Sequence, residues 1–318
     1  MNPIFKIGLL FLCTLFLSGC GVTEQTAEYP EIDRTSVLPA DIQKQSPETD
    51  QHPPILHSDE FLPPVPIPGL VNTSGAEDSA FILPDGKTLY FFFTPDVRIP
   101  PEKQILDNVT GVYVSRKKDG AWAKPERVWL SDPGTLALDG AVAIYGDEMW
   151  FASAREGFDG MHIFTAELID DRWENWQPVS SQLMDDFQLG EVHLHGNDLY
   201  FHSYLPGGKG DLDIWMTTRS DDGWSEPINI ESVNTPGLDG FPCITPDGRE
   251  LWLTRTIDGT PGILRSQKTE TGWSTPELIL SQFAGEPTLD SAGNLYFIHH
   301  YFVDGVMIEA DIYIAYRK

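Results

Sequence analysis

Five acidic residues recur through most of this sequence at intervals of about fifty residues, each near the start of a short apolar run. Carboxyl groups held close together attract a cation or an amine, and two that differ in proton affinity can act as general acid and base. The five positions are Glu77, Asp139, Glu191, Asp239 and Glu286. Their chemistry depends on whether the fold brings them together.

Two histidines add to the third of these acidic positions. Glu191, His193 and His195 alternate along the chain, and alternate residues of a strand face the same side. Two imidazoles and a carboxylate can bind zinc or a similar ion, with His202 as a further candidate ligand. The alternative is that these histidines only form hydrogen bonds within the domain.

The elements that must position these residues are strands of a repeated unit. A Leu-Tyr-Phe-like triplet follows each acid, a second apolar pair follows the triplet, and turns such as Pro84-Asp85-Gly86 separate the runs. No helical periodicity of useful length intervenes. The triplets are Leu89-Tyr90-Phe91, Met149-Trp150-Phe151, Leu199-Tyr200-Phe201, Leu251-Trp252-Leu253 and Leu295-Tyr296-Phe297.

Residues 63–318 are therefore expected to form an all-β domain, a five-bladed β-propeller with four-stranded antiparallel blades. The fifth unit ends at Lys318 after its third strand. Residues 63–71 have the phase of an outer strand, so we expect them to complete the last blade and close the ring. The first strand of each blade would line a channel, with the five acids as a rim at one mouth.

The repeat resembles a known family. Thr245-Pro246-Asp247-Gly248, Leu251-Trp252 and the run Gly210-Asp211-Leu212-Asp213-Ile214-Trp215 look like the WD-like β-propeller repeats of bacterial envelope proteins, the type found in the TolB propeller. The resemblance covers about residues 63–318 and implies a fold rather than an activity.

The N-terminus resembles that of a bacterial lipoprotein. Residues 1–19 read as a signal peptide with an apolar run too short to span a bilayer, and Leu17-Ser18-Gly19-Cys20 looks like a lipobox. The resemblance implies cleavage before Cys20 and its lipidation, which anchors the protein to a membrane. Gly21 stands where aspartate would resemble a retention signal, so the expected location is the periplasmic face of the outer membrane.

Residues 20–62 comprise the lipidated cysteine and a segment rich in Pro, Glu, Asp, Thr and Gln. This segment has too few apolar residues to pack a core, so we expect a disordered tether.

Composition excludes several classes of function. The formal net charge of −27 would repel a phosphate backbone, which argues against nucleic acid as a partner. The 3 cysteines form no C-x-x-C pair, and no cofactor-binding motif is present, so no cofactor is expected.

Two functions remain open. The first is a lipid-anchored, non-catalytic module that binds a protein, a peptide or a glycan. The alternative is a glycan-active hydrolase or lyase that uses some of the five acids. A third interpretation makes the acids structural, each capping a tight turn by accepting backbone N–H bonds.

Overall fold

The computed structural model describes residues 29–318, and its regular structure is almost entirely β-strand. The helical segments are short: η1 (Arg34–Val37), α1 (Pro101–Gln104) and η2 (Gln182–Asp186). No helix in this range has the length and apolar character needed to cross a membrane. The chain is therefore all-β over the described residues, as the repeat pattern predicted.

The strands form four hydrogen-bonded sheets. The four-stranded sheet contains β8 (Ala137–Tyr145), β9 (Glu148–Arg155), β10 (Met161–Ile169) and β11 (Arg172–Pro178). The five-stranded sheet contains β12 (Val192–His195), β13 (Asp198–Ser203), β14 (Asp213–Ser220), β15 (Gly223–Trp224) and β16 (Ile228–Asn229). The six-stranded sheet contains β1 (Ile55–Leu56), β17 (Asp239–Ile244), β18 (Glu250–Ile257), β19 (Thr260–Thr269), β20 (Gly272–Trp273) and β21 (Glu277–Ser281).

The nine-stranded sheet joins the two ends of the described chain. Its strands are β2 (Val65–Pro66), β3 (Ala76–Ile82), β4 (Thr88–Thr94), β5 (Gly111–Lys118), β6 (Ala121–Trp122), β7 (Glu126–Arg127), β22 (Ala284–Leu289), β23 (Leu295–Val303) and β24 (Val306–Ala315). A single parallel pairing, Ala310 with Ala76, connects β24 to β3, and every other pairing in the sheet is antiparallel.

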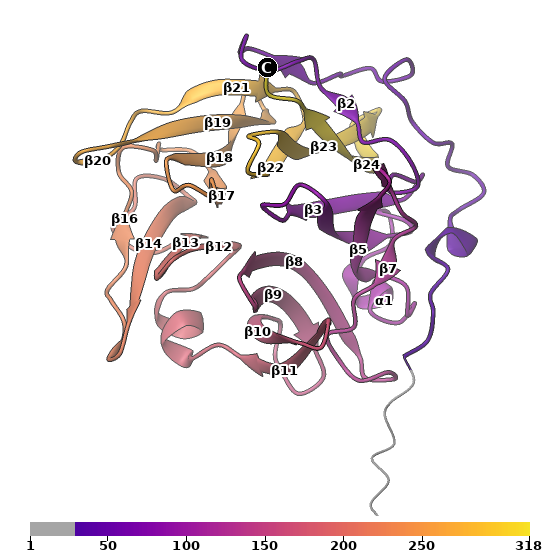
Figure 1. Cartoon of the computed structure of the whole chain (residues 1–318), viewed down its shortest axis with the longest axis horizontal. Helices are drawn as coiled ribbons and strands as arrows, with labels where there is room; N and C mark the ends of the chain where they lie inside the picture. Colours follow the sequence, from indigo (N-terminus) through magenta and orange to yellow (C-terminus); the bar gives the residue numbers. More distant parts are fainter. Residues whose placement is uncertain (1–28) are drawn as a thin grey trace, which may run out of the picture.

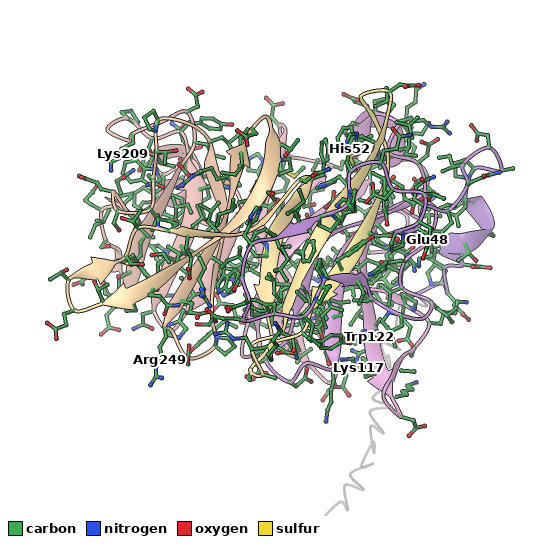
Figure 2. The ribbon with its side chains drawn as sticks, turned by 90° about the horizontal axis from the view of Figure 1, so that it is seen from above. Glu48, His52, Lys117, Trp122, Lys209 and Arg249 are labelled. Atoms are coloured by element: carbon green, nitrogen blue, oxygen red, sulfur yellow. The ribbon has the colours of Figure 1, made fainter. Side chains whose placement is uncertain are left out.

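The sheets surround a common centre, toward which β3, β8, β12, β17 and β22 lie (Figure 1). We call these the inner strands. Seen from the side, the strands run between two faces, one near Lys209 and His52 and the other near Arg249 and Lys117 (Figure 2).

The apolar triplets build the core. They lie on β4, β9, β13, β18 and β23, the second strand of each antiparallel run. Leu199, Phe201, Leu295 and Phe297 are completely buried. Both faces of a sheet are covered by its neighbours, so these strands are apolar on both sides instead of alternating. Such burial supplies most of the stability of a fold of this kind.

The N-terminal strand β2 pairs with the edge of β24, with Val65 opposite Ile314 and Pro66 opposite Tyr313. This is the pairing expected for residues 63–71. Pro66 lacks an N–H, which suits the outermost strand because no further neighbour needs that donor. Ile67 continues the contact by donating its backbone N–H to the carbonyl of Ile312.

Residues 29–62, expected within a disordered tether, lie against the sheets, and we call them the N-terminal strap. Arg34, only 2% exposed, bonds the Glu77 carboxylate and the backbone carbonyl of Val71. Strand β1 pairs with β21, with Ile55 opposite Ser281. The strap has few apolar side chains, of which Phe61 is buried in the core, and polar contacts to buried groups add to its attachment.

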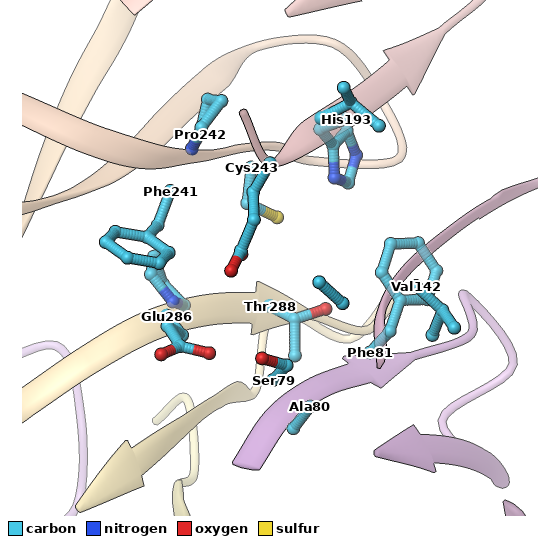
Figure 3. A pocket seen from close by; sticks show the side chains of 14 residues that line it. Ser79, Ala80, Phe81, Val142, His193, Phe241, Pro242, Cys243, Glu286 and Thr288 are labelled. Carbon is cyan, nitrogen blue, oxygen red and sulfur yellow. The ribbon is translucent and has the colours of Figure 1, made fainter. Parts of the chain in front are cut away.

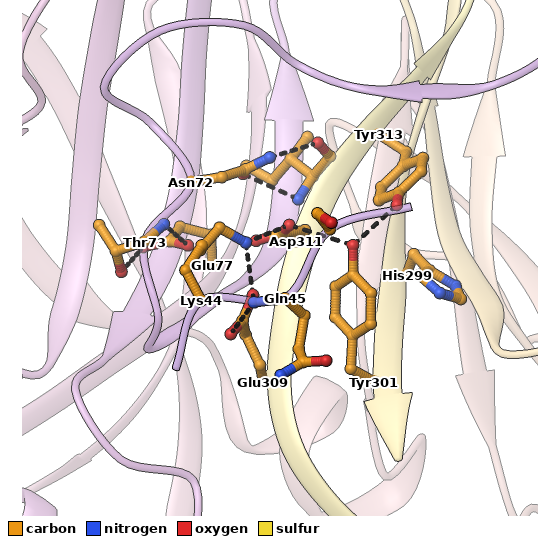
Figure 4. Close-up of polar contacts among 12 residues, drawn as sticks. Lys44, Gln45, Asn72, Thr73, Glu77, His299, Tyr301, Glu309, Asp311 and Tyr313 are labelled. Carbon is orange, nitrogen blue, oxygen red and sulfur yellow. Dashed lines mark hydrogen bonds and ion pairs between the residues drawn. The ribbon is translucent and has the colours of Figure 1, made fainter. Parts of the chain in front are cut away.

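Further along the strap, charged side chains contact residues of the last two strands, β23 and β24 (Figure 4). Lys44 bonds the carboxylates of Glu309 and Asp311, neither of which is accessible to solvent. Asp50 lies 2.8 Å from Nε2 of His299 on β23. The sheets thus contain buried ionisable groups whose partners come from the strap.

Candidate functional site

Each inner strand follows a common local plan. In three of the inner strands an acid, Glu77, Asp139 or Asp239, lies two residues before a β-bulge, and we call its place in the strand the first position. The residues Ser79, Ala141, Phe241 and Glu286 occupy the bulge with φ between 45° and 54°. A bulge increases the local twist and redirects a side chain. It therefore turns the bulge residues away from the regular pleat.

The three acids at the first position are buried and paired. Arg34 bonds Glu77, and the strand β18 residue Arg255 bonds Asp239. Arg155 reaches the carboxylate of Asp139 at 2.7 Å. All three acids are at most 1% exposed. We call them the paired acids.

Two of the paired acids also cap turns. Thr73 donates its backbone N–H to Glu77 at 2.8 Å, and Thr235 donates its own to Asp239 at 2.6 Å. Burial raises the pKa of Glu77 against the opposing charge of Arg34. This is the structural role that the sequence left open for all five acids, and such burial keeps ligands away.

Glu191 and Glu286 lie elsewhere. Glu286 occupies the bulge of β22, two residues after Ala284, and Glu191 lies just before β12, two residues after Leu189. The expected ring of five acids is therefore divided: three are paired and buried, and two are turned toward the central channel. Glu191 and Glu286 both line that channel.

Asp78 and His300 join these two glutamates. Ligand-forming atoms of Asp78, Glu286 and His300 all lie within 4.8 Å of one another. Nε2 of His300 is 3.8 Å from Oδ1 of Asp78. Asp78 and Glu191 share the wall of a neighbouring pocket. We call Asp78, Glu191, Glu286 and His300 the mouth cluster.

The carboxyl groups of the mouth cluster differ in proton affinity. Burial, reinforced by the charge of Asp78, raises the pKa of Glu191 to about 8. Burial and the charges of Asp78 and Glu191 raise the pKa of Glu286 well above its ordinary value. For Asp78, burial acts upward, but His300 and the N–H of Ser79 outweigh it and lower the pKa. At neutral pH the cluster thus combines an ionised Asp78 with a largely protonated Glu191.

The space around the mouth cluster has two parts. The central channel, about 40 Å³ in volume, is lined by residues of all the inner strands (Figure 3). That volume holds a water molecule or two. Beside it lies a pocket of about 410 Å³, and Ser79, Ala141 and Glu191 belong to both. Of these two spaces, the pocket is the one that can admit a ligand larger than water.

The walls of the larger pocket are mainly apolar. They include Phe92 from β4, Leu138 from β8, Ile163 from β10 and Met184 from η2. The ionisable side chains in its lining are Asp78, Glu191 and His202. An apolar cleft with a few convergent polar groups is the usual form of a small-molecule site.

The histidines singled out from the sequence have other surroundings. His193 lines the channel with its ring 5.6 Å from that of Phe81, and burial together with His195 lowers its pKa to about 4. The ring of His195 is 6.4 Å from that of Tyr145. Among residues 29–318, the group with metal-ligand spacing is Asp78, Glu286 and His300, and neither His193 nor His195 belongs to it.

His202 organises the bulges. Its ring nitrogens lie 3.0 Å from the backbone nitrogen of Glu191 and 3.2 Å from that of Phe241. A neutral imidazole has one acceptor nitrogen, so it accepts one of these N–H bonds at a time. Burial lowers the pKa of His202 to about 4, which favours that neutral form. His202 therefore positions Glu191 through the backbone.

Sequence reasoning missed Asp78 and His300. Asp78 stands where the other inner strands have Gly140, Gly190, Gly240 and Gly285, so a position-by-position comparison of the units could have revealed it. His300 gives no such signal, because β23 continues beyond the repeated pattern. The predicted lipidation site, Cys20, lies outside the described residues.

Comparisons with known proteins find similar chains among solved structures. No protein-family model matches the chain, and no curated protein matches it in sequence. TolB from Acinetobacter baumannii is 12% identical with a TM-score of 0.43, and the match covers 75% of this chain. That match spans about half of the TolB chain, 54%.

Glycan-active enzymes are also among the similar structures. The endo-arabinase of Bacteroides thetaiotaomicron is 16% identical with a TM-score of 0.49, and the match covers 78% of this chain and 97% of that one. A thermostable family-43 glycoside hydrolase is 12% identical with a TM-score of 0.46, covering 76% and 95%. Identity is low in every case.

Proposed function

We propose that the described chain forms a five-bladed β-propeller, closed where β2 joins β24, that binds a short glycan at one mouth of its channel. The pairing of β2 with β24 and the convergence of the inner strands on a narrow channel support the closed ring. Such closure would leave no free sheet edge between the chain ends.

The observation that carries the binding function is the mouth cluster beside the larger pocket. Asp78, Glu191 and Glu286 depart from the repeat, whereas the acids that follow the repeat are consumed in ion pairs. Carboxyl groups accept hydrogen bonds from sugar hydroxyls, and apolar walls suit the C–H faces of a sugar ring. A pocket of about 410 Å³ is large enough for one or two sugar units.

We place this function in the cell envelope, with the protein lipid-anchored at Cys20 on the periplasmic face of the outer membrane. Eight residues lie between Cys20 and Tyr29, where the strap begins, so an extended chain reaches at most about 30 Å from one to the other. The domain would then stay close to the membrane. Metabolic labelling with palmitate should mark the wild-type chain. The Cys20→Ser variant should remain unlabelled and should appear in the soluble fraction instead of the membrane fraction.

Titration of the full chain in detergent with glucosamine oligomers tests the binding function. These probes carry hydroxyl and ammonium groups, and isothermal calorimetry should give saturable binding. The Glu191→Gln variant should bind at least tenfold more weakly, since its amide nitrogen cannot accept the hydrogen bonds that a carboxyl oxygen accepts. Glu270→Gln, in an exposed turn, is the matched control. Equal affinity in both variants, or no binding to any short envelope glycan, contradicts the proposal.

The opposite pKa shifts of Asp78 and Glu191 favour a second candidate, glycan hydrolysis. A carboxyl group protonated near pH 7 can protonate a leaving group, while an ionised neighbour serves as base or nucleophile. Incubation with a panel of labelled oligosaccharides would then show turnover that Glu191→Gln reduces by at least a hundredfold. Binding without turnover of any panel member leaves the non-catalytic function.

A further inference from the structure

Three side chains of the mouth cluster have the spacing of ligands to a single ion. Asp78 comes from β3, Glu286 from β22 and His300 from β23, and their ligand-forming atoms lie within 4.8 Å of one another. The 3.8 Å between Asp78 Oδ1 and His300 Nε2 is too long for a hydrogen bond. Two ligands on one ion, each at about 2.0–2.2 Å, are separated by roughly this distance.

Glu286 lacks the partners that buried acids normally have. Oε2 of Glu286 is buried without a hydrogen-bond partner. Within residues 29–318, no lysine or arginine forms an ion pair with Asp78, Glu191 or Glu286. Each paired acid, in contrast, has a guanidinium group in contact. A buried carboxyl group without a counter-charge favours its protonated form, and a bound cation supplies the counter-charge that lets it ionise.

We infer that Asp78, Glu286 and His300 bind one divalent transition-metal ion at the mouth of the channel. Two carboxylates with one imidazole match Zn²⁺ and Mn²⁺ better than Ca²⁺, which takes oxygen ligands. Three protein ligands leave coordination positions free, and Asp78 opens onto the larger pocket. This set differs from the predicted His193, His195 and Glu191, and it rests on geometry rather than on the proposed glycan binding.

Asp78→Gly is the variant best matched to this inference, because glycine occupies the equivalent position in the other inner strands. The full chain in detergent, stripped with a chelator and dialysed, is titrated with ZnCl₂ by calorimetry. The wild type should bind about one equivalent, whereas Asp78→Gly and His300→Gln should each bind at least tenfold more weakly. CaCl₂ should bind more weakly than ZnCl₂ to the wild type.

A control and a second readout keep the inference falsifiable. His57→Gln removes a histidine that directly follows β1 and bonds Ser281, and it should leave zinc affinity unchanged. Zinc should raise the thermal midpoint of the wild type and not that of Asp78→Gly, which also shows whether the variant folds. Wild-type affinity in Asp78→Gly, or an equal loss in His57→Gln, overturns the site. Failure of glycan binding in metal-free buffer would leave the zinc result untouched.

Discussion

The paired acids and the mouth cluster both lie near the centre of the sheets, and β3 carries a member of each, yet the two groups differ in their partners. Glu77, Asp139 and Asp239 each contact an arginine, while Glu191 and Glu286 contact none within residues 29–318. A buried acid with a guanidinium partner is committed to the fold. A buried acid that lacks such a partner has no counter-charge within the described chain, so a ligand or a cation can interact with it. Two residues along a strand separate the two situations.

The largest effect should come from breaking a paired acid. Arg255→Met leaves the fully buried Asp239 without its cation, and we expect a loss of about 3–5 kcal/mol in the free energy of unfolding. Urea unfolding measures it. The double variant Asp239→Asn with Arg255→Met should recover most of the loss, because no charge remains buried. A double variant as unstable as the single one contradicts the comparison.

The strap should show a smaller effect. Lys44→Met removes the cation that contacts Glu309 and Asp311, both inaccessible to solvent. Burial already raises the pKa of Asp311 to about 8, so this acid can protonate instead of remaining charged. We therefore expect a loss of only about 2 kcal/mol near neutral pH. Faster hydrogen exchange in residues 40–50 would accompany it, and unchanged exchange would show that Lys44 does not hold the strap.

The mouth cluster should reveal itself through pH. The pKa of Glu191 is about 8 in the folded chain against the ordinary value of 4.5, so the unfolded chain ionises first as pH rises. The contribution of this group to stability is complete below pH 4.5 and is lost by about pH 8. Between pH 4.5 and pH 8 the free energy of unfolding of Glu191→Gln should therefore rise relative to that of the wild type by about 1–3 kcal/mol. Urea unfolding at pH 4, 6 and 8 measures this difference. A difference between variant and wild type that is the same at all three pH values would refute the raised pKa of Glu191.

The smallest effect on stability should come from breaking an exposed ion pair. Arg249 and Asp247 lie 3.7 Å apart with side chains 82% and 58% exposed. Arg249→Ala should change the free energy of unfolding by less than about 0.5 kcal/mol, because water and salt screen the pair. A thermal unfolding midpoint more than a few degrees lower would show that the turn depends on this contact.

Much of the fold followed from the sequence, because its signals are local. The triplets identified the second strands, and the phase of residues 63–71 indicated the strand that pairs with β24. Turn capping by Glu77 and Asp239 was also among the alternatives considered. The strap was not foreseen: its composition resembles that of a disordered segment, and Arg34 reaches a partner 43 positions away.

The candidate site was predicted only in part for a related reason. Glu191 and Glu286 were singled out, but they were grouped with three acids that have a different role. A shift of two residues keeps a side chain on the same face of an ideal strand. The bulge breaks that rule, and the positive φ of Glu286 marks the place. Bulges arise from pairing with the next strand, which a repeat alignment does not show.

The sequence by itself determined the β-strand architecture and the positions of the acids, because strand periodicity and turn residues act over a few neighbouring positions. Only the tertiary structure decided which acids pair with an arginine side chain and which acids meet at the channel mouth. Asp78 meets His300 across the junction of β3 with the last strands, and Lys44 meets Asp311 from 267 positions away. Such contacts depend on how the sheets assemble, since Coulomb attraction depends on distance in space and not along the chain.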